Sequence, residues 1–163
     1  MLPNIADHSQ QVKNVSLAIV DDLIDPSIVS RDLVIASALL HDIAKTRSIE
    51  TRELRHDLTG AEMMRTLGYE SIAVVVESHV ILDKYRHEGP LEEREIVYYA
   101  DKRVMHDTIV TIDQRVDDLA LRYGLNEKIR EMISENRKFV LMVHAKIQSF
   151  MKNDMEAVLA ALL

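Results

Sequence analysis

Several polar side chains that can bind a metal stand at positions of this sequence that are otherwise apolar. His41 and Asp42 are adjacent and directly follow the hydrophobic run of residues 33–40. Asp101 is spaced three and four residues from Val104 and Val97, which would place it on the same face of a helix. An aspartate at a core position has a high desolvation cost unless it is paired or bound to a metal. A cation held by imidazoles and carboxylates would satisfy these groups together.

Three further histidines lie on neighbouring predicted helices. His8 is on the apolar stripe of the first helix, His56 opens the third, and His79 lies near the end of the fourth. Such nitrogen and oxygen ligands suit iron, manganese, nickel, zinc or magnesium rather than copper(I). Taken singly, each histidine is more often a hydrogen-bonded core residue than a ligand. Asp101 is alternatively an ion-pair partner of Lys102 or of the arginine after it.

The order of these residues resembles the H…HD…D pattern of the HD-domain metal-dependent phosphohydrolases. The pattern begins at His8, continues through the pair at 41 and 42 within the segment LLHDIAK (residues 39–45), and ends at Asp101. His56 and His79 match the two additional histidines of the subgroup of this family that holds two metals. The resemblance covers roughly residues 4–110, and residues 111–163 look like additional helices that vary within the family.

The resemblance implies one or two divalent metal ions per chain. By this resemblance the first metal has four ligands, which are His8, His41, Asp42 and Asp101. The second metal has two further histidine ligands, His56 and His79, and shares the bridging carboxylate of Asp42.

The implied activity is hydrolysis of a phosphate ester or anhydride in a small nucleotide-like or metabolite substrate, by attack of a hydroxide that the metals generate. Asp42 is then catalytic as the bridging ligand. Lys45 lies where the family often has a lysine that contacts the substrate phosphate, and we predict that it stabilises developing charge. Arg47 is predicted to bind substrate together with Lys45, because the segment 45–55 is locally basic. A solvated loop is the alternative interpretation of that segment.

Two other functions agree with the same ligand pattern. Some relatives of this fold bind two irons and activate oxygen to oxidise inositol or an aminophosphonate, so a di-iron oxygenase is the second hypothesis. A regulatory module that binds metal without catalysis is the third. The segment 41–45 also resembles that of bacterial hydrolases of symmetrical dinucleoside tetraphosphates.

The remaining histidines are predicted to lie outside the metal site. His106 follows the fifth helix and is predicted at the surface or at a helix end, with lining of the pocket as the alternative, and His144 is predicted to be structural. His87 lies in a loop near the expected mouth of the site, where some two-metal relatives carry a further histidine.

Helices are the elements that must position these residues. The chain of 163 residues contains only four glycines and three prolines, which favours long uninterrupted helices over many short strands. Apolar residues recur at three- and four-residue spacing almost throughout. We therefore predict an all-α fold, a compact single-domain bundle of the HD-domain type with about seven to eight helices. The single domain spans residues 1–163, with an HD core over roughly 4–110 and additional C-terminal helices over roughly 111–163.

The boundaries of the predicted helices follow from prolines, glycines and capping residues. The helices are predicted over residues 5–24, 28–44, 57–67, 72–82, 91–105, 112–123 and 127–152, followed by a short terminal helix. The polar segment 45–55 is predicted to be a loop.

Composition limits the partners. A net charge of −7 offers little attraction for a long nucleic acid, whereas bound cations can still attract a small phosphorylated substrate. The absence of cysteine excludes disulfides and zinc–thiolate sites and agrees with a cytoplasmic location. The N-terminus does not resemble a signal peptide, and no apolar run is long enough to span a membrane. We expect a soluble protein without a membrane partner, and a homo-oligomer formed through residues beyond Thr111 is compatible with the sequence.

Overall fold

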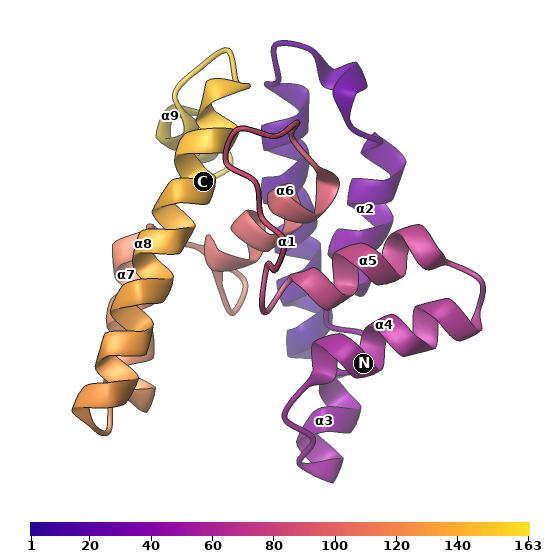
Figure 1. Cartoon of the computed structure of the whole chain (residues 1–163), viewed down its shortest axis with the longest axis vertical. Helices are drawn as coiled ribbons and strands as arrows, with labels where there is room; N and C mark the ends of the chain where they lie inside the picture. The colour runs from indigo at the N-terminus through magenta and orange to yellow at the C-terminus, as the bar shows by residue number, and fades with distance from the viewer.

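The computed structural model of the protein describes residues 1–163 and confirms the predicted all-α fold (Figure 1). It contains nine α-helices, one short 3-10 helix and one two-stranded hairpin. In chain order the elements are α1 (Pro3–Asp21), η1 (Pro26–Ile28), α2 (Arg31–Leu40), α3 (Lys45–Thr51), α4 (His56–Thr66), α5 (Glu70–Ser78), α6 (Glu93–Lys102), β1 (Val104–Met105), β2 (Thr108–Ile109), α7 (Ile112–Tyr123), α8 (Glu127–Ser149) and α9 (Met155–Ala160).

The hydrophobic core forms around α1 and α6. One stripe of α1 is fully buried, and it includes Val12, Val15 and Ile19 at the three- and four-residue spacing of one helical face. Helix α6 is buried along most of its length because α1, α2, α5 and α8 all pack against it. Asp101 lies in the last turn of α6 and is therefore carried into the interior.

The second helix, predicted over residues 28–44, is shorter than predicted at both ends. The structure has η1 at Pro26–Ile28, and α2 begins only after Ser30, whose side chain accepts a hydrogen bond from the backbone N–H of Leu33. Helix α2 ends at Leu40, and the backbone N–H groups of Ile43 and Lys45 donate to carbonyls three residues earlier. This tightened turn, and not a helix, carries His41 and Asp42.

The predicted loop at 45–55 is also wrong, because residues Lys45–Thr51 form α3. This helix is largely exposed and has no buried residue, so the sequence lacks the apolar periodicity that reveals other helices. It ends at Thr51, and the residue that caps it, Arg52, adopts a left-handed conformation with φ of 62°.

The fifth predicted helix begins two residues too early and extends three residues too far. Helix α6 ends at Lys102, and β1 pairs with β2 in an antiparallel hairpin with Val104 opposite Ile109. The turn contains His106 in a left-handed conformation with φ of 58°, as two-residue hairpin turns require. Strands of two residues are too short to produce an alternating sequence pattern, so the hairpin was not predicted.

The C-terminal helices contribute to the same core. Helices α7 and α8 lie side by side, and α8 packs against α6 with Val143 and Ile147 fully buried (Figure 1). Helix α8 ends at Ser149, before the predicted residue 152, and α9 packs against α1. None of the helices combines the length and the hydropathy that crossing a bilayer requires.

Candidate metal centre

The structure brings together the six histidine and aspartate residues that were predicted as metal ligands. His8 lies on α1, and His41 and Asp42 lie in the turn after α2. His56 is the first residue of α4, His79 caps the end of α5, and Asp101 lies on α6. Four of these six residues are buried, and His8 and His56 are partly buried.

The first group of donor atoms is formed by His8, His41 and Asp101, whose ligand atoms all lie within 4.8 Å of one another. The Nε2 atom of His8 is 3.0 Å from Oδ1 of Asp101, and Nε2 of His41 is 3.7 Å from the same oxygen. One carboxylate oxygen of Asp101 therefore lies close to two imidazole nitrogens.

The second group is formed by His41, Asp42 and His79, again within 4.8 Å, with His56 beside it. Oδ1 of Asp42 is 3.0 Å from Nε2 of His56 and 3.4 Å from Nε2 of His79. The other oxygen of Asp42, Oδ2, is 3.7 Å from Nε2 of His41. Asp42 therefore lies between the two groups and presents an oxygen to each of them.

Backbone carbonyls fix the orientation of three imidazoles. His41 and His79 cap the ends of α2 and α5, where the last carbonyls of a helix have no partner within it. Nδ1 of His41 lies 2.8 Å from the Ala38 carbonyl oxygen, and Nδ1 of His79 lies 2.6 Å from that of Val76. If each Nδ1–H donates to its carbonyl, each Nε2 lone pair points into the centre, as in most metal-binding histidines.

His8 is held in the same way by the unexpected hairpin. Its Nδ1 lies 2.8 Å from the carbonyl oxygen of His106 in the turn between β1 and β2. The side chain of His106 is exposed, as predicted for a surface residue, but its backbone has a role that the sequence did not reveal.

Two buried atoms of the centre have no hydrogen-bond partner. They are Nε2 of His41 and Oδ1 of Asp42, because the close approaches of the neighbouring histidines to this oxygen lack hydrogen-bond geometry. An unpaired buried polar atom is costly, and a bound cation removes the cost for both atoms. Imidazole nitrogens and carboxylate oxygens are suitable ligands for a borderline or hard divalent cation, so the residues fit a metal.

The electrostatic environment keeps these groups in the forms that bind a metal. Complete burial lowers the pKa of His41 to about 4, although Asp42 acts in the opposite direction, so the imidazole is neutral near pH 7. Burial alone would raise the pKa of Asp42, but His56 and His79 hold it far below its usual value. Metal ligands must be deprotonated, and both groups are.

Asp101 is held in its ionised form by a lysine that the sequence suggested only as an alternative ion-pair partner. Burial would raise the pKa of Asp101, but Lys102 and then His8 hold it well below its usual value. Nζ of Lys102 donates to Oδ2 of Asp101 at 2.7 Å and to the carbonyl oxygen of His79 at 2.8 Å. Because Lys102 uses one carboxylate oxygen, the other oxygen is turned toward the histidines.

A cavity of about 240 Å³ opens beside the centre. Its walls include His8, Asp42 and Lys45, and Nζ of Lys45 is 3.8 Å from Oδ1 of Asp42 and 3.3 Å from Nε2 of His56. The remaining wall residues are Asn4, Ile5, Ile49, His106, Arg115, Leu119, Arg122 and Tyr123. The four residues of α7 in this wall were not predicted, because helical spacing alone does not show which neighbour a helix faces.

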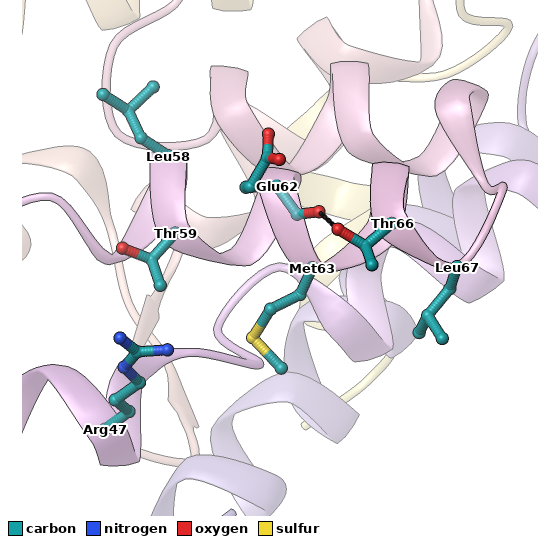
Figure 2. A pocket seen from close by; sticks show the side chains of 7 residues that line it. All are labelled: Arg47, Leu58, Thr59, Glu62, Met63, Thr66 and Leu67. Atoms are coloured by element: carbon teal, nitrogen blue, oxygen red, sulfur yellow. Dashed lines mark hydrogen bonds between the residues drawn. The ribbon is translucent and has the colours of Figure 1, made fainter.

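The structure does not bring Arg47 to this cavity. Figure 2 shows Arg47 facing a different hollow, whose other walls come from α4 and the residue after it: Leu58, Thr59, Glu62, Met63, Thr66 and Leu67. Arg47 instead forms an exposed ion pair with Glu53 at 3.3 Å. That hollow has a volume of about 630 Å³, but no histidine or aspartate lines it, so its size does not indicate a reaction there.

The other residues considered from the sequence are also separate from the centre. His144 lies with Nδ1 2.7 Å from the hydroxyl oxygen of Tyr99, at the contact of α8 with α6. His87 lies with Nδ1 3.0 Å from the hydroxyl oxygen of Tyr85 and does not line the cavity. Arg55 is bound to Asp57 through a 2.7 Å ion pair.

Comparison with known proteins agrees with this geometry. The model of the HD domain family matches residues 5–106, a region that contains all six clustered residues. An uncharacterized protein of Methanocaldococcus jannaschii is 31% identical over 109 residues, which are 58% of this chain and 62% of that protein. The match therefore spans about three fifths of the length of this relative. No solved structure shows a significant match to the chain.

Proposed function

The chain belongs to the HD domain family, and from this premise we propose that it is a metal-dependent phosphohydrolase. The observation that carries the proposal is the pair of buried, unpaired atoms Nε2 of His41 and Oδ1 of Asp42. They lie among further nitrogen and oxygen donors, of which the imidazoles of His8 and His79 are already oriented by backbone carbonyls. A divalent cation satisfies all of these donors at once, whereas a structural role would leave the two atoms unpaired.

We propose that four of the residues hold one divalent cation and that two histidines hold a second. The four ligands are His8, His41, Asp42 and Asp101. The two histidines are His56 and His79, and they share Asp42 with the first site. When bound, divalent cations polarise a phosphoryl group and lower the pKa of water toward neutrality.

The chain's own residues bind the substrate and stabilise charge. Lys45 is about two fifths exposed, at the boundary between the ligand cluster and the cavity, so its ammonium group can reach a phosphoryl oxygen. A fixed positive charge at this position stabilises the negative charge that develops on that oxygen. The buried faces of α1, α2 and α6 exclude bulk water from the other side of the centre, which strengthens these interactions.

The experiment that tests the proposal combines metal analysis with a panel of phosphoesters and phosphoanhydrides. We expect the purified protein to contain a stoichiometric divalent metal and to release phosphate from at least one compound after metal addition. Asp42→Asn should lose both the metal and the activity. Arg31→Gln, an exposed residue paired with Asp21 on another part of the surface, should keep both.

Lys45→Ala separates charge stabilisation from metal binding. We expect turnover to fall by about 100-fold while the metal content stays unchanged, because the lysine is not a ligand. A fully loaded protein that hydrolyses no compound of the panel would contradict the proposal. Oxygen consumption by the iron-loaded protein that depends on an organic substrate would instead support an oxygenase.

A further inference from the structure

Helix α7 forms a second wall of the cavity that contains the candidate metal ligands. Arg115, Leu119 and Arg122 are spaced four and three residues apart, so they lie on one face of α7. The same cavity is lined by His8, Asp42 and Lys45 on its other side. This wall lies outside residues 5–106, so it is a feature of this chain that the family match does not cover.

The positive charge on this wall is only partly neutralised within the protein. Asp118 forms ion pairs with both arginines, at 3.6 Å from Nη1 of Arg115 and at closer range from Nη2 of Arg122. No other carboxylate pairs with these two guanidinium groups, so one negative charge is shared by two positive charges. The wall is therefore cationic in a protein whose net charge is −7.

Arg115 also has an unsatisfied donor. Its Nε atom is buried and has no hydrogen-bond partner, and its side chain is about one fifth exposed. A guanidinium group presents several N–H donors in a planar fork that matches the oxygens of a phosphate or a carboxylate. Arg115 lines the cavity, so an anion there would meet the part of this side chain that is exposed.

We propose that Arg115 and Arg122 bind a second anionic group of the substrate, distinct from the phosphoryl group at the histidine and aspartate centre. This inference rests on the proposed phosphohydrolase function. The substrate is then a small phosphorylated compound with a further phosphate or carboxylate. Leu119 and Tyr123, on the same wall, contact the carbon skeleton between the two anionic groups.

The volume of the cavity agrees with a compact substrate. At about 240 Å³ it lies below the roughly 300–1,000 Å³ of sites for drug-sized ligands. A metabolite of a few carbons with two anionic groups is a better match to this space than a dinucleotide.

The test compares three phosphate esters that differ in whether they carry a second anionic group and in which anionic group it is. They are 4-nitrophenyl phosphate, which has none, propane-1,3-diol bisphosphate, and 3-(phosphonooxy)propanoic acid. We expect Arg115→Gln and Arg122→Gln to raise KM at least tenfold for one or both of the doubly anionic compounds. The KM for 4-nitrophenyl phosphate should change less than twofold, and the metal content should stay unchanged. The doubly anionic compound whose KM rises in these variants identifies the second group as a phosphate or a carboxylate.

Asp118→Asn is expected to change KM in the opposite direction. Because Asp118 competes with the substrate for both guanidinium groups, its neutralisation should lower KM for the doubly anionic compounds. A merely structural role of the ion pairs would instead make all three variants less active toward every substrate. Equal effects on the three substrates, or no effect, would overturn the inference. Arg31→Gln serves as the arginine control outside the cavity.

A binding measurement keeps the inference distinct from the proposed function. Methylenediphosphonate is not hydrolysed, and its affinity for the metal-depleted protein can be measured by calorimetry. We expect the Arg115→Gln, Arg122→Gln double variant to bind it at least tenfold more weakly than the unmodified protein. Equal affinity would overturn the inference even if hydrolysis is observed. Arginine-dependent binding without any hydrolysis would overturn only the proposed function.

Discussion

The histidines of the candidate metal centre are oriented mainly by the backbone. His41 and His79 occupy equivalent positions at the ends of two helices, and Nδ1 of each approaches a carbonyl three residues earlier. His8 obtains the same support from a hairpin turn almost a hundred residues away in sequence. Because these contacts involve only atoms of the chain, they orient the imidazoles without help from an ion, and this preorganisation would lower the entropic cost of binding a metal.

Lys102 is predicted to control metal affinity without touching the metal. It holds Oδ2 of Asp101 and the carbonyl oxygen of His79, and so connects two candidate ligands from different elements. Lys102→Met removes both contacts, and we expect metal affinity to fall by about 10- to 100-fold, as for other residues that support ligands. Competition with a chromogenic chelator measures this affinity. The exposed-lysine variant Lys138→Met should bind metal normally, and equal affinity of the two variants would show that Lys102 has no such role.

The metal-free protein is predicted to lose stability in acid through His41. Burial lowers the pKa of this residue from 6.5 to about 4, so between these values the unfolded state binds more protons than the folded state. Stability contributed by the neutral imidazole is present above pH 6.5 and is lost as the pH falls toward 4. The expected loss is about 3 kcal/mol between roughly pH 7 and pH 4.

The contribution of His41 to stability is measured as the difference in unfolding free energy between the unmodified protein and a variant. Burial would lower the pKa of His8, but its contacts with Asp101 raise it, so His8 acts with the opposite sign and complicates the profile of the unmodified protein. Urea unfolding in the presence of a chelator should therefore be compared with His41→Gln, which cannot titrate. The stability difference between the two proteins should shrink by about 3 kcal/mol in acid. Parallel pH profiles would contradict the prediction.

The sequence was sufficient to predict which residues gather at the site. It was much less informative about the residues that surround and support them. His41, Asp42 and Asp101 stand out because polar groups at apolar positions need a partner. The supporting role of Lys102 and the position of Arg115 depend on contacts between distant elements, which leave no local pattern. Arg47 shows the opposite case, because proximity in sequence to the His-Asp pair did not bring it to the cavity.

At the scale of elements, α6 is the helix on which the centre depends. It carries Asp101, and it is attached to α8 by a buried ion pair in which Nζ of Lys146 is 2.6 Å from Oε1 of Glu95. Lys146 also donates to the carbonyl oxygens of Arg86 and Pro90, so this one ammonium group serves three acceptors. The loop before α6 is thereby connected to α8.

Lys146→Met is predicted to destabilise the protein strongly. The substitution keeps an apolar chain of similar length but leaves the buried carboxylate of Glu95 without its cation, and we expect a loss of about 3–5 kcal/mol in the free energy of unfolding. Chemical denaturation measures this value. Lys138→Met, which breaks an exposed pair with Glu135, should change stability by less than about 1 kcal/mol. Similar values for the two variants would show that the buried pair is not important.

Helix positions followed from the sequence wherever one face of the helix is buried. The apolar stripe of α1 and the dense run of α2 predict both helices, although caps such as Ser30 shift their ends. Helix α3 has no buried residue, and β1 and β2 have two residues each. None of these three elements therefore produces the periodic apolar pattern on which the prediction depends. The turn that carries His41 and Asp42 was hidden because its residues continue the apolar periodicity of α2.

At the scale of the whole molecule, the C-terminal helices complete the core and do not form a separate layer on its surface. The main cluster of buried apolar residues includes Val12 and Ile19 of α1 together with Val143 and Ile147 of α8 and Met155 of α9. Polar contacts strengthen the same junction. Arg103, at the end of α6, is almost fully buried and forms a two-pronged ion pair with Glu156 of α9 at 2.7 and 2.8 Å.

These contacts predict that the region matched by the family does not fold alone. A chain ending at residue 110 loses several buried side chains, among them Val140, Val143, Ile147, Met155 and Leu159. Each contributes about 2 kcal/mol when buried, and together they contribute on the order of 10 kcal/mol, which is comparable to the whole stability of a domain. We therefore expect the fragment 1–110 to lack a cooperative thermal transition by circular dichroism and to bind metal weakly. Removal of Leu162 and Leu163, which are exposed, should leave both properties intact. A fragment 1–110 that unfolds cooperatively and binds metal with the affinity of the full chain would show that α7, α8 and α9 are only an addition to an independent core.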